Sequence, residues 1–341
     1  MEILILGGGV FLGRACLDAA VARGHSVTVF NRGRSRAYWP IEVEAVAGDR
    51  TQGLAPLAGR RFDAVIDTCA YRPQDLELAC TALRDSVASY CLVSSVSAYA
   101  SLAHAPLLET DPAAALDDHD TETVSGANYG PLKAECERVL SRHFGERSLI
   151  VRPGLIVGPD DPTGRFSYWV WRGAAGGRVL APGRAGRRIQ CIDARDLAAW
   201  LVDLLEVGGS GSFNATGPVC GDAGGSLGEL IESALDLAGS AGEIEWVGDD
   251  FLLAQGVAPW TELPLWLPES DPQTRGLYSA DLGRARSAGL RTRPLAQTMN
   301  DILAAGVPPM DDRRRAGKLA PAREAELLAA WDAVRTNTPS R

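Results

Sequence analysis

A tyrosine and a lysine four residues apart are the pair in this sequence best suited to proton chemistry. They begin the segment Tyr129-Gly130-Pro131-Leu132-Lys133, where we expect a helix to start. Spacing of four places both side chains on one helical face, with their Cβ atoms about 5–6 Å apart. An ammonium at that distance stabilises a phenolate and so lowers the pKa of the tyrosine toward neutral pH, where it can exchange a proton. The pair therefore indicates a general acid–base site.

Serine hydroxyls follow one of the expected strands. Residues 90–93 form an apolar run, and Val93-Ser94-Ser95-Val96-Ser97 leads out of it. Ligands of open α/β sheets bind at the carboxyl ends of the strands, so these hydroxyls project toward that edge. A hydroxyl beside a phenol and an ammonium can hold a carbonyl oxygen during hydride transfer. Because a Tyr-x-x-x-Lys spacing is common by chance, it indicates an active site only together with the strands and turns around it.

A glycine-rich turn connects the first expected strand, residues 3–6, to a helix. Glycines at such a turn allow a pyrophosphate to approach the backbone at the helix N-terminus. Gly13 also removes a Cβ where the helix packs on the strand. The position between strand and helix makes this signal stronger than the glycines alone. The residues predicted to bind a dinucleotide here are Gly7, Gly9, Val10, Phe11, Leu12 and Gly13.

The end of the second expected strand, residues 26–30, bears on cofactor choice. An acid at this point normally accepts the ribose 2′-hydroxyl, whereas arginine suits a 2′-phosphate. The sequence continues as Asn31-Arg32-Gly33-Arg34-Ser35-Arg36 and has no acid there. This local chemistry favours NADP(H) over NAD(H), and NAD(H) stays an alternative.

Alternation of apolar runs with helical segments predicts a doubly wound α/β fold with a parallel sheet covered on both faces. The expected strands include residues 3–6, 26–30, 64–67, 90–93 and 148–151, and 190–193 with the helix 194–205 extends the same layer. We expect a dinucleotide-binding domain at 1–162 plus about 187–218. A smaller, C-terminal substrate-binding lobe is expected at 163–186 plus 219–341, including a final helix.

Net charge, apolar runs, cysteines and histidines each bear on which classes of function are possible. A net charge of −9 over 341 residues argues against a nucleic-acid partner. No apolar stretch reaches the ~20 residues needed to span a bilayer, and the first strand at Glu2 leaves no room for a signal peptide. The seven cysteines show neither a CxxC nor a disulfide pattern, which indicates reduced thiols and a cytoplasmic location. The four histidines lie outside any ligand-spaced cluster, so we expect no metal.

Taken together, the motifs resemble the short-chain dehydrogenase/reductase superfamily, in its extended or atypical NAD-dependent epimerase/dehydratase branch. The resemblance covers residues 1 to about 220 and a C-terminal element at 289–304. It implies a Rossmann fold and a homodimer built on the helix that carries Tyr129 and Lys133. The matching segments are 7–13, 31–33, 48–50, 94–99, 129–133, 152–154, 158–159, 190–197 and 213–217.

The resemblance also implies roles for individual residues. Ser95 would orient the substrate, Tyr129 would exchange the proton, and Lys133 would bind the nicotinamide ribose. Asp49 would meet the adenine and the backbone at Pro153 would lie beside the nicotinamide. Further cofactor-binding residues implied by the matching segments or the basic loop are Asn31, Arg32, Arg36, Arg50, Thr68, Cys69 and Ala70.

The sequence departs from the family pattern at two places. Val10 stands where the middle glycine of the turn is usual, and a β-branched side chain there would crowd the pyrophosphate. Asp67-Thr68-Cys69-Ala70-Tyr71 replaces the usual His-x-Ala-Ala, which alters the cofactor wall and places Tyr71 near the substrate entrance. The predicted substrate-facing residues are Tyr71, Ser97, Trp260 and Trp266, with core packing an equal reading for both tryptophans.

These observations predict an NADP(H)-dependent oxidoreductase acting on a carbonyl, alcohol or imine of a small metabolite, with Tyr129 as general acid/base. A sugar-nucleotide epimerase or dehydratase that retains its cofactor is the alternative enzyme. A non-catalytic RNA-binding member of the superfamily is the alternative from another class, and the acidic balance disfavours it. The substrate itself is decided by the second lobe.

Overall fold

The computed structural model describes residues 1–34, 39–116, 123–217 and 225–337, which form two compact units. Unit 1 comprises Met1–Ile156, Cys191–Gly217 and Arg275–Thr292. Unit 2 comprises Val157–Gln190, Pro218–Thr274 and Arg293–Arg341.

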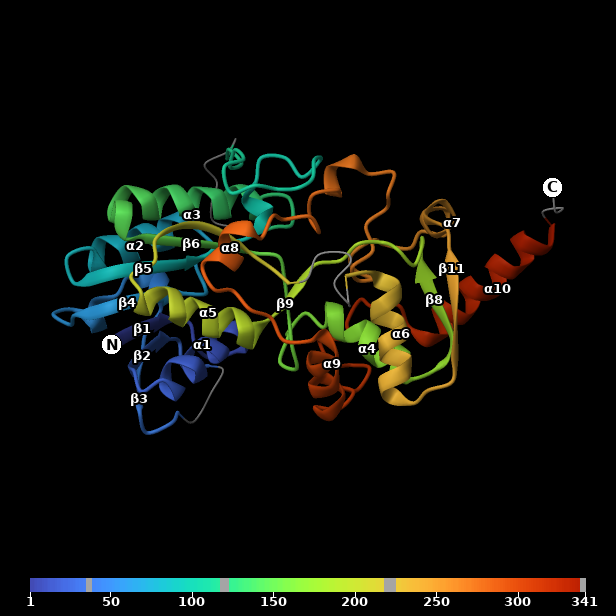
Figure 1. Ribbon diagram of the computed structural model, residues 1–341, viewed down its shortest axis with the longest axis horizontal. Helices are drawn as coiled ribbons and strands as arrows, with labels where there is room; N and C mark the ends of the chain where they lie inside the picture. The colour runs from blue at the N-terminus through green and yellow to red at the C-terminus, as the bar shows by residue number, and fades with distance from the viewer. Residues whose placement is uncertain (35–38, 117–122, 218–224, 338–341) are drawn as a thin grey trace. The chain divides into compact units, whose positions relative to one another are not determined.

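Unit 1 is built on a seven-stranded parallel sheet in the order β10-β6-β5-β4-β1-β2-β3 (Figure 1). The chain runs outward from β1 to β3 and then returns to place β4 on the other side of β1, which creates a topological switch point between β1 and β4. This is the doubly wound α/β fold that the sequence predicts. The strands are β1 (Glu2–Leu6), β2 (Ser26–Asn31), β3 (Val43–Ala47), β4 (Phe62–Asp67), β5 (Val87–Val93), β6 (Ser148–Pro153) and β10 (Gly211–Ala215).

Helices cover both faces of this sheet. Alternation along β1 explains why, because Ile3 and Ile5 pack under one pair of helices while Leu4 and Leu6 pack under the other. The first pair is α1 (Phe11–Ala22) and α5 (Ala194–Glu206), and the second is α2 (Pro73–Leu83) and α3 (Tyr129–Phe144). Short 3₁₀ turns complete the connections: η1 (Arg50–Gln52), η2 (Ala55–Leu57), η3 (Val96–Ala98) and η4 (Gly145–Arg147).

Two details of unit 1 differ from the sequence expectation. Residues 191–193 form β9 (Cys191–Asp193), which pairs with β7 (Leu155–Val157) outside the large sheet, and β10 takes the edge position. Residues 275–292 belong to unit 1 and not to the C-terminal lobe. Ala280 bridges to Leu107, and the Trp200 indole donates to the Ala288 carbonyl at 2.9 Å beside α8 (Gly283–Ser287).

Unit 2 has a two-stranded parallel sheet, β8 (Gly177–Pro182) with β11 (Gly242–Val247), and a pair of packed helices, α4 (Arg165–Ala174) and α6 (Leu227–Ala238). The approach of these helices requires Gly173, because a Cβ there would lie 2.5 Å from the Ala234 Cβ. The remaining elements are α7 (Asp249–Ala254), η5 (Pro272–Thr274), α9 (Leu295–Ala304) and α10 (Pro321–Asn337).

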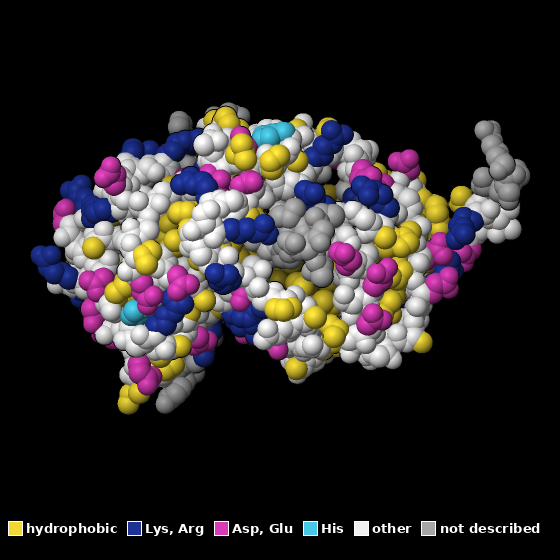
Figure 2. All heavy atoms as spheres, viewed as in Figure 1, with side chains coloured by type: hydrophobic (Ala, Val, Ile, Leu, Met, Phe, Trp, Pro, Cys, Tyr) yellow, Lys and Arg dark blue, Asp and Glu magenta, His cyan; other side chains and the backbone are white. Residues whose placement is uncertain are grey.

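Ion pairs hold the C-terminal helix α10 to the rest of unit 2. Arg172 contacts Glu324 at 2.7 Å, and Arg178 contacts Asp332 at 2.6 Å. Figure 2 shows Lys and Arg interspersed with Asp and Glu over the visible face. None of the helices described is both long and apolar enough to cross a membrane.

Candidate active site

The glycine turn is shaped by close backbone approach. Gly7 and Gly8 have positive φ, and a Cβ at Gly13 would lie 2.7 Å from the Gly8 nitrogen. Only glycine at 13 therefore lets α1 begin this close to the end of β1. Val10 precedes the helix without a side-chain cap, and the first turn has no acidic residue. An uncapped helix N-terminus is the backbone arrangement that accepts an anionic phosphate.

The side chains of the turn are directed away from its backbone. Val10 is 52% exposed, so its branched side chain faces solvent and does not fill the turn. Leu12 is buried in the core beneath α1, so its side chain does not fill the turn either. Gly9 and Phe11 are half-buried, and Phe11 has an unusual φ of +44°.

Asn31 holds the glycine turn from the neighbouring strand. Its side-chain amide donates to the Gly7 carbonyl at 2.8 Å and accepts from the Gly33 N–H at 2.7 Å. These bonds tie the end of β2 to the glycine turn, and contact of Asn31 with a cofactor stays a prediction. Arg32 and Arg34 are exposed after it, whereas Arg36 lies outside the described residues.

Asp49 is a half-buried acid at the start of η1. Its carboxylate accepts from the backbone N–H and the hydroxyl of Thr51, which lowers the pKa of Asp49, and the charges of Arg32 and Arg34 add to that effect. The structure therefore brings the expected adenine-side acid close to the basic loop.

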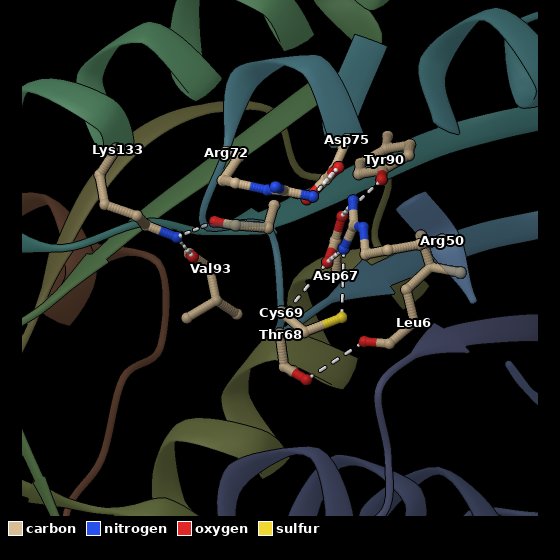
Figure 3. Close-up of polar contacts among 11 residues, drawn as sticks. Leu6, Arg50, Asp67, Thr68, Cys69, Arg72, Asp75, Tyr90, Val93 and Lys133 are labelled. Carbon is tan, nitrogen blue, oxygen red and sulfur yellow. Dashed lines mark hydrogen bonds and ion pairs between the residues drawn. The ribbon is translucent and has the colours of Figure 1, made fainter. Parts of the chain in front are cut away.

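The wall formed by residues 67–70 follows β4, and Figure 3 shows its contacts. Thr68 donates its hydroxyl to the Leu6 carbonyl at 3.2 Å, and the Cys69 N–H donates to Asp67 at 3.0 Å. Burial raises the pKa of the Cys69 thiol to about 11. The Arg50 guanidinium is engaged by Asp67 at 2.8 Å and 2.9 Å, so both of its terminal nitrogens point into the protein.

Lys133 occupies the junction of this wall with β5. Only 3% of it is exposed, and its ammonium donates to the carbonyls of Ala70 at 2.8 Å and Val93 at 2.6 Å. The Tyr71 ring lies 5.6 Å from the ammonium and 6.5 Å from the Tyr129 ring. The three side chains predicted at this point are thus brought together at the carboxyl ends of β4 and β5.

Ser95 and Ser97 lie at the end of β5, against the start of α3. A Cβ at Gly130 would collide with the Ser97 carbonyl oxygen, so the Tyr-Gly sequence allows α3 to begin directly against this serine segment. Ser95 accepts a hydrogen bond from the Ser97 N–H at 3.1 Å. Within the described chain its own hydroxyl proton has no acceptor, so it is available to a ligand.

Behind these residues lies an ionic cluster that the sequence analysis missed. Glu137, one turn after Lys133 on α3, forms a bidentate pair with Arg152 on β6, at 2.9 Å and 2.6 Å. Ser94 donates its hydroxyl to the same carboxylate. The Arg152 guanidinium also stacks 4.6 Å from the Tyr99 ring, whose hydroxyl donates to Asn214 at 2.6 Å. An arginine inside an otherwise apolar strand was the signal available in the sequence.

Pro153 ends β6 and is buried. The next residue, Gly154, packs against Thr216, whose hydroxyl is buried and has no partner in the described residues. Pro153 thus lies at the carboxyl end of β6, and its place beside a nicotinamide stays a prediction.

The two tryptophans predicted to face a substrate lie in unit 2 and differ in environment. Trp266 exposes none of its surface and donates its indole N–H to Asp249 at 2.8 Å, which makes it a core residue. Trp260 is half-buried and stacks under the Arg165 guanidinium at 5.0 Å. Only Trp260 therefore offers a surface to a ligand.

Among the residues described, no three His, Cys, Asp or Glu side chains form a group able to hold a metal ion.

No family model matches the sequence, and no curated protein matches it. Solved structures do match. They include UDP-N-acetylglucosamine 4-epimerase from Bacillus cereus, the Bordetella bronchiseptica enzyme WbmH in complex with NAD⁺, and human epimerase family protein SDR39U1 (isoform 2) with NADPH.

Their sequence identities to this chain are 16%, 16% and 19%, and their TM-scores are 0.65, 0.65 and 0.61. Each match covers 89% of this chain and, in the same order, 98%, 97% and 99% of the other. The chain therefore has the Rossmann-type fold of these solved proteins, as the sequence resemblance predicts.

Proposed function

We propose that unit 1 binds NADP(H) and that the protein is an oxidoreductase acting on a carbonyl, alcohol or imine of a small metabolite. The observation that carries this is the buried Lys133 ammonium at the ends of β4 and β5, one helical turn from Tyr129 and beside the serine segment. The uncapped α1 and the glycine turn fit a pyrophosphate. When bound, the nicotinamide supplies hydride exchange with the substrate carbon.

The protein's own groups handle the proton. Tyr129 exchanges it with the oxygen of a carbonyl or alcohol, or with the nitrogen of an imine, and the charge of Lys133 stabilises the phenolate. Two of the three N–H groups of Lys133 are used by Ala70 and Val93, and the third has no acceptor among the described residues. That N–H is free for a ribose hydroxyl. Ser95 donates a hydrogen bond through its hydroxyl to the same substrate atom and keeps its proton.

The experiment is a Tyr129→Phe substitution, with NADPH oxidation followed across a panel of ketones, aldehydes and imines. We expect NADPH affinity to change little and turnover to fall by about 10²–10⁴-fold, the usual contribution of a positioned acid. Tyr168→Phe is the matched control, because it removes a buried hydroxyl that has no partner in the described residues. Near-native turnover by Tyr129→Phe contradicts the mechanism.

A preference for NADP(H) is supported by the exposed Arg32 and Arg34. A 2′-phosphate would be held by their guanidinium groups. Titration with NADPH and NADH should therefore show tighter NADPH binding, and Arg32→Ala should reduce the difference. Equal affinities in the native protein would contradict this preference.

The second candidate is a sugar-nucleotide epimerase, favoured by similarity to UDP-N-acetylglucosamine 4-epimerase. The same Tyr129 would then exchange the proton, with no net use of cofactor. Stoichiometric NADPH consumption during turnover identifies a reductase, and product formation without it identifies an epimerase.

We further propose a homodimer formed through α2 and α3. The outer side of these helices has a hollow of about 360 Å³, and Leu78 on α2 is 43% exposed. Light scattering should give twice the chain mass, and Leu78→Glu should shift the protein toward monomer. The hollow is lined by Pro73, Gln74, Glu77, Leu116, Glu135, Val139 and Arg142.

A further inference from the structure

Arg50 and Asp67 form a buried ion pair in unit 1. The two terminal nitrogens of Arg50 meet the two carboxylate oxygens of Asp67 at 2.8 Å and 2.9 Å, with side-chain exposures of 11% and 0%. The Tyr90 hydroxyl donates to the same carboxylate at 2.7 Å. Burial alone would raise the pKa of Asp67, but the charge and hydrogen bonds of Arg50 outweigh it and lower the pKa, so the pair stays ionised.

This pair also forms hydrogen bonds to the turn that follows β4. Asp67 accepts the Cys69 N–H at 3.0 Å, and Arg50 donates to the Cys69 sulfur at 3.1 Å. One residue later, the Ala70 carbonyl accepts the Lys133 ammonium at 2.8 Å. Figure 3 shows this series of contacts, with Arg50 at one end and Lys133 at the other.

We propose that Arg50 is a positioning residue for Lys133, acting through Asp67 and the turn 67–70. The inference rests on the proposed function, because it gives Lys133 a cofactor-binding role. It revises the sequence expectation for Arg50, whose terminal nitrogens are used inside the protein and not by a cofactor. Because Arg50 directly follows Asp49, the acid expected to meet the adenine is one peptide bond away from this pair.

Simple stabilisation is a weak explanation for this arrangement. Two charges lose their hydration when they are buried, and an apolar pair of similar volume is often as stable. An apolar pair cannot make the two hydrogen bonds that this pair makes to Cys69. Arg50 donates to the Cys69 sulfur, and Asp67 accepts the Cys69 N–H. The ionic pair fixes the path of the backbone up to the carbonyl that Lys133 uses.

The test is a double-mutant cycle read out as NADPH affinity from fluorescence titration. Arg50→Lys keeps the charge but loses the bidentate geometry. We expect it to weaken NADPH binding about tenfold in the native background, a loss of about 1.4 kcal/mol of binding free energy. In a Lys133→Met background the same change should have less than about a twofold effect, because the group it positions is gone. Equal effects in both backgrounds overturn the proposal.

Hydrogen exchange at the amides of Cys69 and Ala70 gives a readout independent of cofactor. Faster exchange there, with unchanged exchange in β6, is expected for Arg50→Lys, and unchanged exchange in the turn contradicts the proposal. Arg60→Lys is the matched control, because Arg60 pairs with Glu44 on the surface at 2.6 Å. If Arg50→Lys does not fold, the charge-free pair Arg50→Met/Asp67→Leu replaces it, with the same expected results.

The outcomes separate this inference from the proposed function. If the native protein does not bind NADPH, the proposed function is wrong. A native protein that binds NADPH, but whose Arg50 and Lys133 substitutions act additively, defeats only the inference.

Discussion

Replacing Arg152 by Met tests how unit 1 holds the carboxyl ends of β5 and β6 together. Arg152 and Glu137 each expose 6% of their side chains and are joined by two hydrogen bonds of 2.9 Å and 2.6 Å. The substitution leaves the Glu137 carboxylate buried with the Ser94 hydroxyl but without its counter-charge. Removing one partner of such a buried pair costs about 3–5 kcal/mol.

Hydrogen exchange at the amides of β5 and β6 measures this cost, because both are interior strands with a neighbour on each side. The double variant Arg152→Met/Glu137→Met should recover part of the loss, since no charge is then left buried, although Ser94 loses its acceptor. Arg60→Met, which breaks an exposed pair with Glu44, should leave exchange unchanged. The reasoning is refuted if Arg152→Met is as harmless as Arg60→Met.

Three further predictions concern pH, thiol reactivity and the glycine turn. Because the pKa of Asp67 is lower in the native state, its stabilisation is complete above the unfolded value of about 4 and disappears as pH falls toward the native value. Thermal melts in the acid range should therefore lose less stability for Asp67→Asn than for the native chain. Burial raises the pKa of Cys16 to about 12, so mass spectrometry should find its peptide alkylated by iodoacetamide only after unfolding. Gly13→Ala places a Cβ 2.7 Å from the Gly8 nitrogen and should weaken NADPH binding at least about tenfold. Gly248→Ala, where a Cβ meets open space, should not, and equal affinities for the two variants would contradict the steric argument.

Local patterns made much of unit 1 predictable. The alternation that sends Ile3 and Leu4 to opposite faces, and the helix beginning at Tyr129 and ending at Phe144, both follow from spacing within a few residues. The edge strand β10 was missed, because Gly211, Ser212 and Asn214 give it a weak strand pattern, and the clearer run at 190–193 pairs elsewhere.

Contacts between distant segments could not be read from the sequence. Arg50 meets Asp67, and Glu137 meets Arg152, only because the sheet order places their elements together. The sequence likewise could not separate a core tryptophan from a ligand-facing one. Trp266 and Trp260 have similar sequence surroundings, but Trp266 is fully buried and Trp260 is half-buried.

Intermolecular nuclear Overhauser effects test the central claim most directly. The protein would be labelled with ¹³C-tyrosine and saturated with NADPH, and Tyr129→Phe would assign the Tyr129 ring signals. The account predicts effects between the nicotinamide ring protons and Tyr129, and weaker ones to its neighbour Tyr71, 6.5 Å away. Bound NADPH whose nicotinamide shows effects to other tyrosines, but none to Tyr129 or Tyr71, would contradict it.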